Sequence, residues 1–218
     1  MTAKIITIYN QKGGCGKTTI SVQVAGTLGL RGNKVLLVDL DEQGSASRCL
    51  ANADEDKPFP AATINLAAMT GKAHVEIRKH LDNYDYIVID CPPSVNNPAP
   101  SNALVISDLA VIPVIPSPPD ILASVAAKEL AKKAQMLNED LKIVMLANQV
   151  QARTSLARDA IDLLNEEADE IPLLESRLAS RTAFRESLGN GSTVHALEGQ
   201  DKAVQEVDSL VDELLKYL

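Results

Sequence analysis

Short apolar runs alternate with longer segments of helical spacing along the 218-residue chain. The apolar runs are rich in Val and Ile, and they predict strands at 4–9, 34–39, 85–90, 109–115, 142–147 and 171–174. Apolar residues at helical spacing predict helices at 18–30, 75–81, 117–138, 155–168 and 201–218. Strands and helices in alternation predict right-handed crossovers. The fold class is therefore α/β: one domain, residues 1–218, with a doubly wound, mainly parallel sheet flanked by helices.

Prolines interrupt this pattern in three places. Residues 51–71 include Pro58 and Pro60 and predict a loop followed by a short helix, while residues 92–102 hold four prolines and predict an irregular loop. Pro113 lies inside the strand predicted at 109–115. Because proline lacks the N–H that a central strand donates, we predict an edge position or an irregularity there.

The composition restricts the class of protein. Hydrophobic residues make up 45% and aromatic residues only 3%, so Val, Ile, Leu and Ala build the core, as in buried parallel sheets. A net charge of −8 argues against a protein that coats nucleic acid with its whole surface, but it permits a local basic patch. Cys15, Cys49 and Cys91 lack paired spacing and predict reduced thiols. No segment approaches the roughly 20 apolar residues of a membrane span, and no signal peptide is recognised, so we expect a soluble, cytoplasmic protein.

A glycine-rich segment lies between the first predicted strand and the first predicted helix. It reads Lys-Gly-Gly-Cys-Gly-Lys-Thr-Thr over 12–19. Its glycines allow a tight turn with N–H groups pointing inward, and the following helix adds its positive end. Lys17 can reach the β- and γ-phosphates of a nucleotide, and the Thr18 hydroxyl can bind Mg²⁺. The motif predicts a P-loop NTPase that binds ATP and Mg²⁺ through Gly13, Gly14, Cys15, Gly16, Lys17, Thr18 and Thr19.

One position departs from the common phosphate-binding loop. That pattern has glycine where this chain has Gln11, and Lys12 is an additional lysine. The K-G-G-x-G-K-T-T sequence resembles the deviant Walker A signature of the ParA/MinD family of ATPases. In that family the additional lysine crosses an ATP-bound dimer and contacts the partner's nucleotide. The resemblance implies a homodimer in the ATP-bound state and this role for Lys12; a solvated loop lysine is the alternative.

Acidic residues close two of the predicted strands. The segment from Asp39 to Gln43 resembles the D-x-D-P-Q segment of the family, with Glu42 in place of proline. Two carboxylates at the carboxyl end of a strand can hold the waters of Mg²⁺ and orient an attacking water. By resemblance, Asp41 positions that water and Asp39 supports the metal. Asp90 ends the strand at 85–90, precedes Cys-Pro-Pro, and resembles the Walker B aspartate that binds Mg²⁺ through water.

Asn148 closes the strand predicted at 142–147. The family resemblance implies that an Asn or Asp near this point contacts adenine, which favours ATP over GTP. Simple termination of the strand is the alternative.

Two further segments, 115–120 and 183–188, resemble the short ParA-type plasmid and chromosome partition ATPases. The resemblance implies an ATP-bound dimer that binds nonspecific DNA of the nucleoid, and a centromere-binding adaptor protein that stimulates hydrolysis. A related ATPase that positions a protein cargo or the division site remains an alternative, and a small-molecule ligase on the same fold is a more distant one. Residues 201–218 hold two lysines and five acids, which disfavours a membrane-binding helix.

Basic residues near the carboxyl-terminal third are candidates for DNA contact. Their spacing places three arginines on one face of a predicted helix, and two more could join that surface. They are Arg177, Arg181 and Arg185, with Arg153 and Arg158. The alternative is ordinary ion pairing with Glu175 or Glu186.

Overall fold

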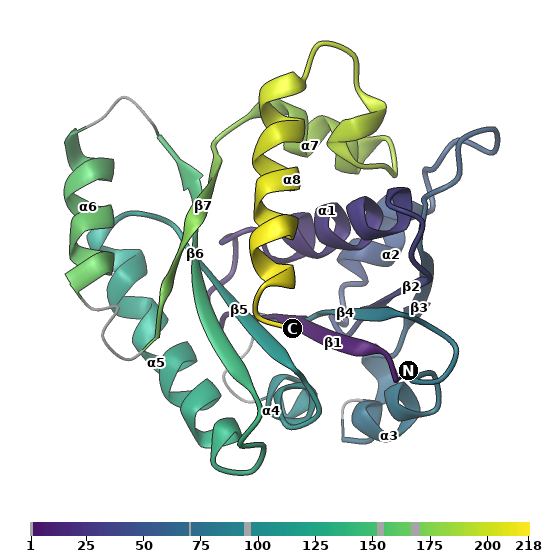
Figure 1. The fold of residues 1–218 in the computed structure, drawn as a ribbon, viewed down its shortest axis with the longest axis horizontal. Coiled ribbons are helices and arrows are strands. Elements are labelled where there is room, and N and C mark those ends of the chain that lie inside the picture. Colours follow the sequence, from purple (N-terminus) through teal and green to yellow (C-terminus); the bar gives the residue numbers. More distant parts are fainter. Residues whose placement is uncertain (1, 70, 94–96, 152–154, 167–170) are drawn as a thin grey trace.

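Seven strands form one sheet in which every neighbouring pair is parallel (Figure 1). The computed structural model describes residues 2–69, 71–93, 97–151, 155–166 and 171–218. The strand order is β3-β2-β4-β1-β5-β6-β7. The strands are β1 (Lys4–Ile8), β2 (Val35–Asp39), β3 (Ala62–Asn65), β4 (Tyr86–Asp90), β5 (Leu109–Val114), β6 (Lys142–Val150) and β7 (Leu173–Ala179). The predicted doubly wound parallel sheet is confirmed.

Helices cover both faces of the sheet (Figure 1). One face is covered by α3 (Ala73–Arg78), α4 (Ala99–Leu104), α5 (Pro118–Gln135) and α6 (Ser155–Glu166). The other face is covered by α1 (Lys17–Leu30), α2 (Ser45–Leu50), α7 (Thr182–Gly189) and α8 (Asp201–Leu215). The described residues also contain two short 3₁₀ turns, η1 (Ala67–Met69) and η3 (Val194–Ala196). No helix in these described stretches combines the length and the apolarity needed to cross a membrane.

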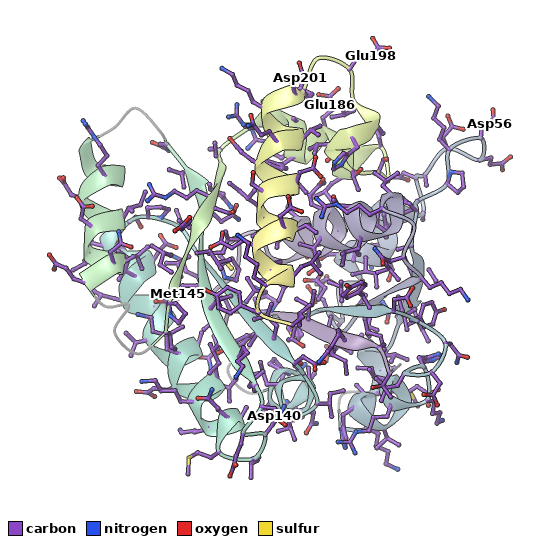
Figure 2. All side chains as sticks on the ribbon, viewed as in Figure 1. Asp56, Asp140, Met145, Glu186, Glu198 and Asp201 are labelled. Carbon is purple, nitrogen blue, oxygen red and sulfur yellow. The ribbon has the colours of Figure 1, made fainter. Side chains whose placement is uncertain are left out.

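The strands are apolar at successive positions because both of their faces are buried. Ile5 packs against the α5 side of the sheet, whereas Ile6 packs against the α1 side. Met145 of β6 is fully buried beside β7 (Figure 2). Side chains of successive strand residues point to opposite faces, so a sheet covered on both sides needs continuous apolar runs.

The position of Pro113 corrects the sequence prediction, because β5 is a central strand between β1 and β6. Its pairing with β1 ends where Val111 lies opposite Ile8. Tyr9 N–H donates to the carbonyl of Val111, so Pro113, two residues on, faces the same side beyond the end of β1. There the side chain of Asn10 donates to the Pro113 carbonyl over 2.9 Å. On the β1 side of β5, no described strand reaches the position where an N–H of residue 113 would donate. The missing N–H of Pro113 therefore breaks no ladder hydrogen bond, and the sheet tolerates the proline.

Other elements differ in extent from the prediction. The segment 51–71 contains the edge strand β3, and helix α4 begins at Ala99, within the segment predicted as an irregular loop. The short strand predicted at 171–174 is shifted to Leu173–Ala179. The terminal helix predicted at 201–218 is confirmed over Asp201–Leu215, with its apolar stripe buried against the sheet. The loop between α2 and β3 carries Asp56 away from the body of the molecule (Figure 2).

The outer edge of β7 is closed by carboxylates of α8. Glu213 accepts hydrogen bonds from the backbone N–H groups of Glu175 and Ser176, both at 2.8 Å. Two turns earlier on the helix, Glu206 accepts a hydrogen bond from the backbone N–H of Ala179 at 3.0 Å. The side chains of α8 therefore occupy donors that an added strand would otherwise use.

Candidate nucleotide-binding site

The glycine-rich loop connects β1 to α1 at the carboxyl end of the sheet, where ligands bind in folds of this class. Gly14 and Gly16 both have positive φ, 77° and 91°, which glycine adopts without the clash of a Cβ atom. Gly16 is the N-cap of α1, and neither a side-chain cap nor an acidic residue occupies the first turn. The first N–H groups of α1 are therefore available to an anion, as a phosphate site requires.

The two lysines of the loop point to different places. Lys17 is buried, and its Nζ donates to the carbonyl of Lys12 over 2.8 Å and approaches Cys15 Sγ at 3.9 Å. The ammonium of Lys17 thus lies inside the turn of the loop, and its contact with nucleotide phosphates stays a prediction. Lys12 is half-exposed and forms an ion pair with Asp120 at the start of α5. The ammonium of the additional lysine is therefore held by α5.

The cysteines near the loop are free thiols, in agreement with the prediction. Cys15 is buried within the loop, and Cys91 is buried directly after β4. Burial raises the pKa of both thiols. Both side chains are therefore neutral at physiological pH and act as small apolar residues beneath the loop.

Asp90 has the environment of a metal-binding carboxylate. It is fully buried at the end of β4, and its Oδ1 accepts from Ser21 Oγ at 3.2 Å. Its Oδ2 has no hydrogen-bond partner among the described residues. Burial raises the pKa of Asp90 to about 7, and hydrogen bonds from the hydroxyls of Thr18 and Ser21 only partly oppose this. A buried carboxylate oxygen without a partner, beside the Thr18 hydroxyl, fits the hard oxygen donors that Mg²⁺ prefers.

Asp39 and Asp41 are engaged by the chain itself. Asp39 Oδ1 accepts from the N–H of Asp41 at 3.0 Å, and its Oδ2 accepts from the N–H and the hydroxyl of Ser47, both at 2.9 Å. Asp41 in turn accepts from the N–H of Gln43 at 3.0 Å and faces the hydroxyl of Ser45. In this arrangement the hydrogen bonds of Asp39 organise the β2–α2 loop. The carboxylate of Asp41 is half-exposed and therefore accessible to solvent.

Asn148 and Gln149, at the end of β6, contact the loop directly. Asn148 Nδ2 donates to the carbonyl of Cys15 at 2.7 Å, and Gln149 Nε2 donates to the carbonyl of Gly14 at 2.8 Å. The amide nitrogen of Asn148 therefore binds the loop, and the adenine contact implied for this residue stays a prediction. Beside them lies a cavity of about 110 Å³. It is lined by Gly16, Thr19, Asn148, Gln149, Ala179, Ser180, Arg181, Phe184 and Arg185.

The predicted arginine face is wrong as a helical surface. Arg177 lies in β7, Arg181 is the N-cap of α7, and only Arg185 lies within that helix. Arg181 is bound by Glu206 of α8 at 2.5 and 3.0 Å, a partner that sequence proximity to Glu175 and Glu186 did not suggest. Arg158 lies on α6, across the sheet, and Arg153 is outside the described residues.

A polar groove of about 540 Å³ between β7 and α8 holds the other basic residues of this region. Arg177, Arg181 and Lys202 line it together with Glu175 and Glu206. No ion pair within the described parts of the chain involves Arg177 or Lys202. Lys202 was missed by the sequence analysis because it comes from α8, and only the fold brings it beside Arg177.

The loop, Asp90 and the β6 amides assemble at one end of the sheet, and a family profile agrees with this arrangement. Residues 6–194 match the CobQ/CobB/MinD/ParA nucleotide-binding domain. The chain belongs to the ParA/MinD family. The resemblance inferred from the loop sequence is thereby confirmed, and so is the assignment of the chain as a nucleotide-binding protein.

Relatives within the ParA/MinD family carry names that refer to different processes. The chain is 30% identical over 217 residues to the maintenance of carboxysome distribution protein A of Halothiobacillus neapolitanus, covering 96% of this chain and 95% of that one. It is 35% identical over 200 residues to the sporulation initiation inhibitor protein Soj of Bacillus subtilis, covering 73% and 78%. An ATP complex of Cyanothece McdA has the same fold, with a TM-score of 0.80, 16% identity, and coverage of 98% and 96%.

Proposed function

We propose that this protein is a ParA-type ATPase that binds ATP with Mg²⁺, dimerises, binds DNA without sequence preference, and releases it after hydrolysis. An adaptor protein on the cargo stimulates that hydrolysis. Cycles of binding and release on the nucleoid move or space the cargo, and the first candidate cargo is a plasmid or chromosome that carries a centromere-like site.

The nucleotide half of this proposal follows from the loop. Its inward N–H groups and Lys17 hold the phosphate chain, and Thr18 and Asp90 hold Mg²⁺. When bound, Mg²⁺ neutralises charge on the β- and γ-phosphates. Asp41, on the β2–α2 loop that Asp39 organises, orients the attacking water. The cavity beside Asn148 provides the volume next to the loop into which the nucleoside extends.

The observation that carries the dimer is the position of Lys12. A monomer already has Lys17 inside the phosphate loop, and Lys12 pairs instead with Asp120 of α5. A second lysine in the same loop is then available to contact a nucleotide bound by an adjacent copy. The ATP-bound dimer is therefore the state in which Lys12 acts on phosphate.

The DNA half rests on the groove between β7 and α8. Arg177 and Lys202 line it with no ion-pair partner among the described residues, so both are available to phosphates. Arg181 is already neutralised by Glu206 and contributes less charge. A dimer doubles this small basic surface, which allows a protein of net charge −8 to bind a polyanion locally.

A protein cargo is the second candidate. The similarity to the carboxysome distribution protein extends over nearly the whole of both chains, whereas the similarity to Soj covers less of each. Both functions share the ATP-dependent dimer and nonspecific DNA, and they differ in the adaptor. Capture of adaptors on the ATP-bound protein, followed by assay of each for stimulation of ATP hydrolysis, distinguishes a DNA-bound adaptor from one bound to a protein body.

The proposal is tested by following ATP turnover with and without DNA and adaptor, together with DNA retention in the presence of ATP. We expect turnover that DNA and adaptor raise together, and retention that requires ATP. Lys17→Ala should lose tight ATP binding because it removes the cation that faces the phosphates. A parent chain that retains no DNA at low salt and micromolar concentration contradicts the DNA half, and a Lys17→Ala variant that binds ATP like the parent contradicts the nucleotide half.

A further inference from the structure

The end of β6 has an irregular backbone beside the phosphate loop. Its pairing with β7 shifts register between Met145 and Ala147 and again between Ala147 and Val150. Within this interval Gln149 has φ of 54°, the only positive φ of a non-glycine residue among the described residues. This conformation is unfavourable for a residue with a Cβ atom and is seldom kept without a compensating interaction.

The irregularity directs two consecutive side chains to one target. In a regular strand, neighbouring side chains point to opposite faces of the sheet. Here Asn148 and Gln149 both donate amide hydrogen bonds to the phosphate loop, to the carbonyls of Cys15 and Gly14. The shifted register and the positive φ of Gln149 are what allow both amides to reach it, as bulges near binding sites commonly do.

The two carbonyls determine where the N–H groups of the loop point. In a trans peptide the C=O and N–H point in opposite directions, and no cis peptide occurs in the described residues. The Gly14 carbonyl shares its peptide with the N–H of Cys15, and the Cys15 carbonyl shares its peptide with the N–H of Gly16. With both carbonyls bound to β6, these two N–H groups face away from β6, into the loop.

Gly16 supports the same arrangement from the loop's side. A Cβ atom at Gly16 would lie 2.2 Å from Nδ2 of Asn148. Only glycine leaves room for that amide to approach the Cys15 carbonyl, in addition to accepting a φ of 91°.

We propose that Gln149, in its left-handed conformation, is a positioning residue that acts with Asn148 to hold the phosphate loop open toward the nucleotide's phosphates. This inference rests on the proposed nucleotide function of the same loop. The glutamine need not touch the nucleotide; it holds the Gly14 carbonyl away from the phosphates and the adjoining N–H toward them. The affinity for the phosphate chain therefore depends on a hydrogen-bond donor at this position.

Two substitutions separate the donor from the backbone strain. Gln149→Gly removes the amide and also relieves the unfavourable φ, so the melting temperature of the ligand-free protein should stay close to that of the parent. Its affinity for ADP with Mg²⁺, measured by calorimetry, should fall about five- to tenfold, as expected for the loss of one hydrogen bond. Gln149→Lys retains a donor of similar reach and should stay within about twofold of the parent.

A matched control lies at the opposite end of the sheet. Asn138 Nδ2 donates to the carbonyl of Ser107 at 2.7 Å, a bond of the same kind as that of Asn148. Asn138→Ala should lower the melting temperature and leave ADP affinity unchanged. Parent-like ADP affinity in Gln149→Gly, or failure of Gln149→Lys to restore it, overturns this inference alone. A parent chain that binds neither ADP nor a nonhydrolysable ATP analogue overturns the proposed function, and this inference with it.

Discussion

The ammonium of Lys12 and the carboxylate of Asp120 form an ion pair within one chain, between the phosphate loop and the first turn of α5. The Asp120 side chain is only 13% exposed, whereas that of Lys12 is 36% exposed. If Lys12 serves the nucleotide of a second copy, this pair competes with that contact. The resting position of Lys12 then opposes dimerisation.

Asp120→Asn should therefore dimerise more readily in the presence of a nonhydrolysable ATP analogue. We expect the protein concentration at half-dimerisation to fall about two- to fivefold, since partly exposed ion pairs contribute of the order of 1 kcal/mol or less. Sedimentation velocity measures this directly, with Lys12→Ala as the control that should remain monomeric. If Asp120→Asn needs a higher concentration than the parent, Asp120 instead positions Lys12 within the dimer.

Asp41 and Asp39 should have separable effects. Asp41→Asn should bind ATP about as tightly as the parent and turn it over about a hundredfold or more slowly, because it loses the group proposed to orient the attacking water. Asp39→Asn should instead lower the free energy of unfolding by about 1–3 kcal/mol, because the buried acceptor of the Asp41 and Ser47 N–H groups is weakened. Steady-state kinetics, calorimetry and thermal melts distinguish the two. Equal turnover in parent and Asp41→Asn would exclude Asp41 from hydrolysis.

Basic residues of the polar groove between β7 and α8 should affect DNA binding, and those of the cavity beside Gly16 should affect ATP binding. Arg177→Ala combined with Lys202→Ala should weaken DNA binding and reduce the slope of log affinity against log salt by about 0.9 per lost phosphate contact, while ATP affinity is unchanged. Arg185→Ala should weaken ATP binding more than it weakens DNA binding, because Arg185 lines the cavity beside Gly16. Filter binding across a salt series, in parallel with calorimetry, separates these effects. Arg158→Ala, across the sheet on α6, is the matched control, and loss of DNA binding there would relocate the surface.

The pKa of Asp90 predicts how stability changes with pH. Its folded-state pKa of about 7 is above the ordinary value of 3.8, so the folded chain holds this proton more tightly than the unfolded chain. The neutral Asp90 carboxyl therefore contributes fully to the free energy of unfolding below pH 3.8. This contribution is lost as the pH rises from 3.8 toward 7. In ligand-free protein, the free energy of unfolding of Asp90→Asn relative to the parent should thus increase by about 2 kcal/mol when the pH is raised from about 5.5 to about 8.5. Melts in which the difference is independent of pH would contradict a buried, titrating Asp90.

Local sequence was sufficient for the parts of the molecule that one continuous segment determines. The phosphate loop is contiguous, and Asp90 directly follows an apolar run, so both could be located from their neighbours along the chain. Pro113 was assigned to an edge or an irregularity, whereas β5 is central: β6 pairs alongside Pro113 and only β1 ends before it, a fact of register that no single strand reveals. Arg177 was assigned to a helix because it lies four residues from the next arginine. The same spacing also fits one face of a strand, and Arg177 lies in β7.

Contacts between distant segments account for what the sequence did not reveal. The pairing of Arg181 with Glu206 joins two helices across 25 residues, and Gln149 reaches Gly14 across 135 residues. Asp39 was expected to support the metal, yet its oxygens accept bonds from Ser47, eight residues on. In each case the residue type was informative, but its partner depended on tertiary structure.

If the protein gathers at high local density on DNA, as the proposed function requires, the glutamates of α8 along β7 have a consequence for its assembly. Crowded sheet proteins join through exposed edge strands, which leads to filaments or precipitates. At one border of this sheet Glu206 and Glu213 already occupy backbone donors, and at the other border β3 is only four residues long. Under the proposed function, copies could therefore accumulate side by side without their sheets pairing, and each could leave separately after hydrolysis.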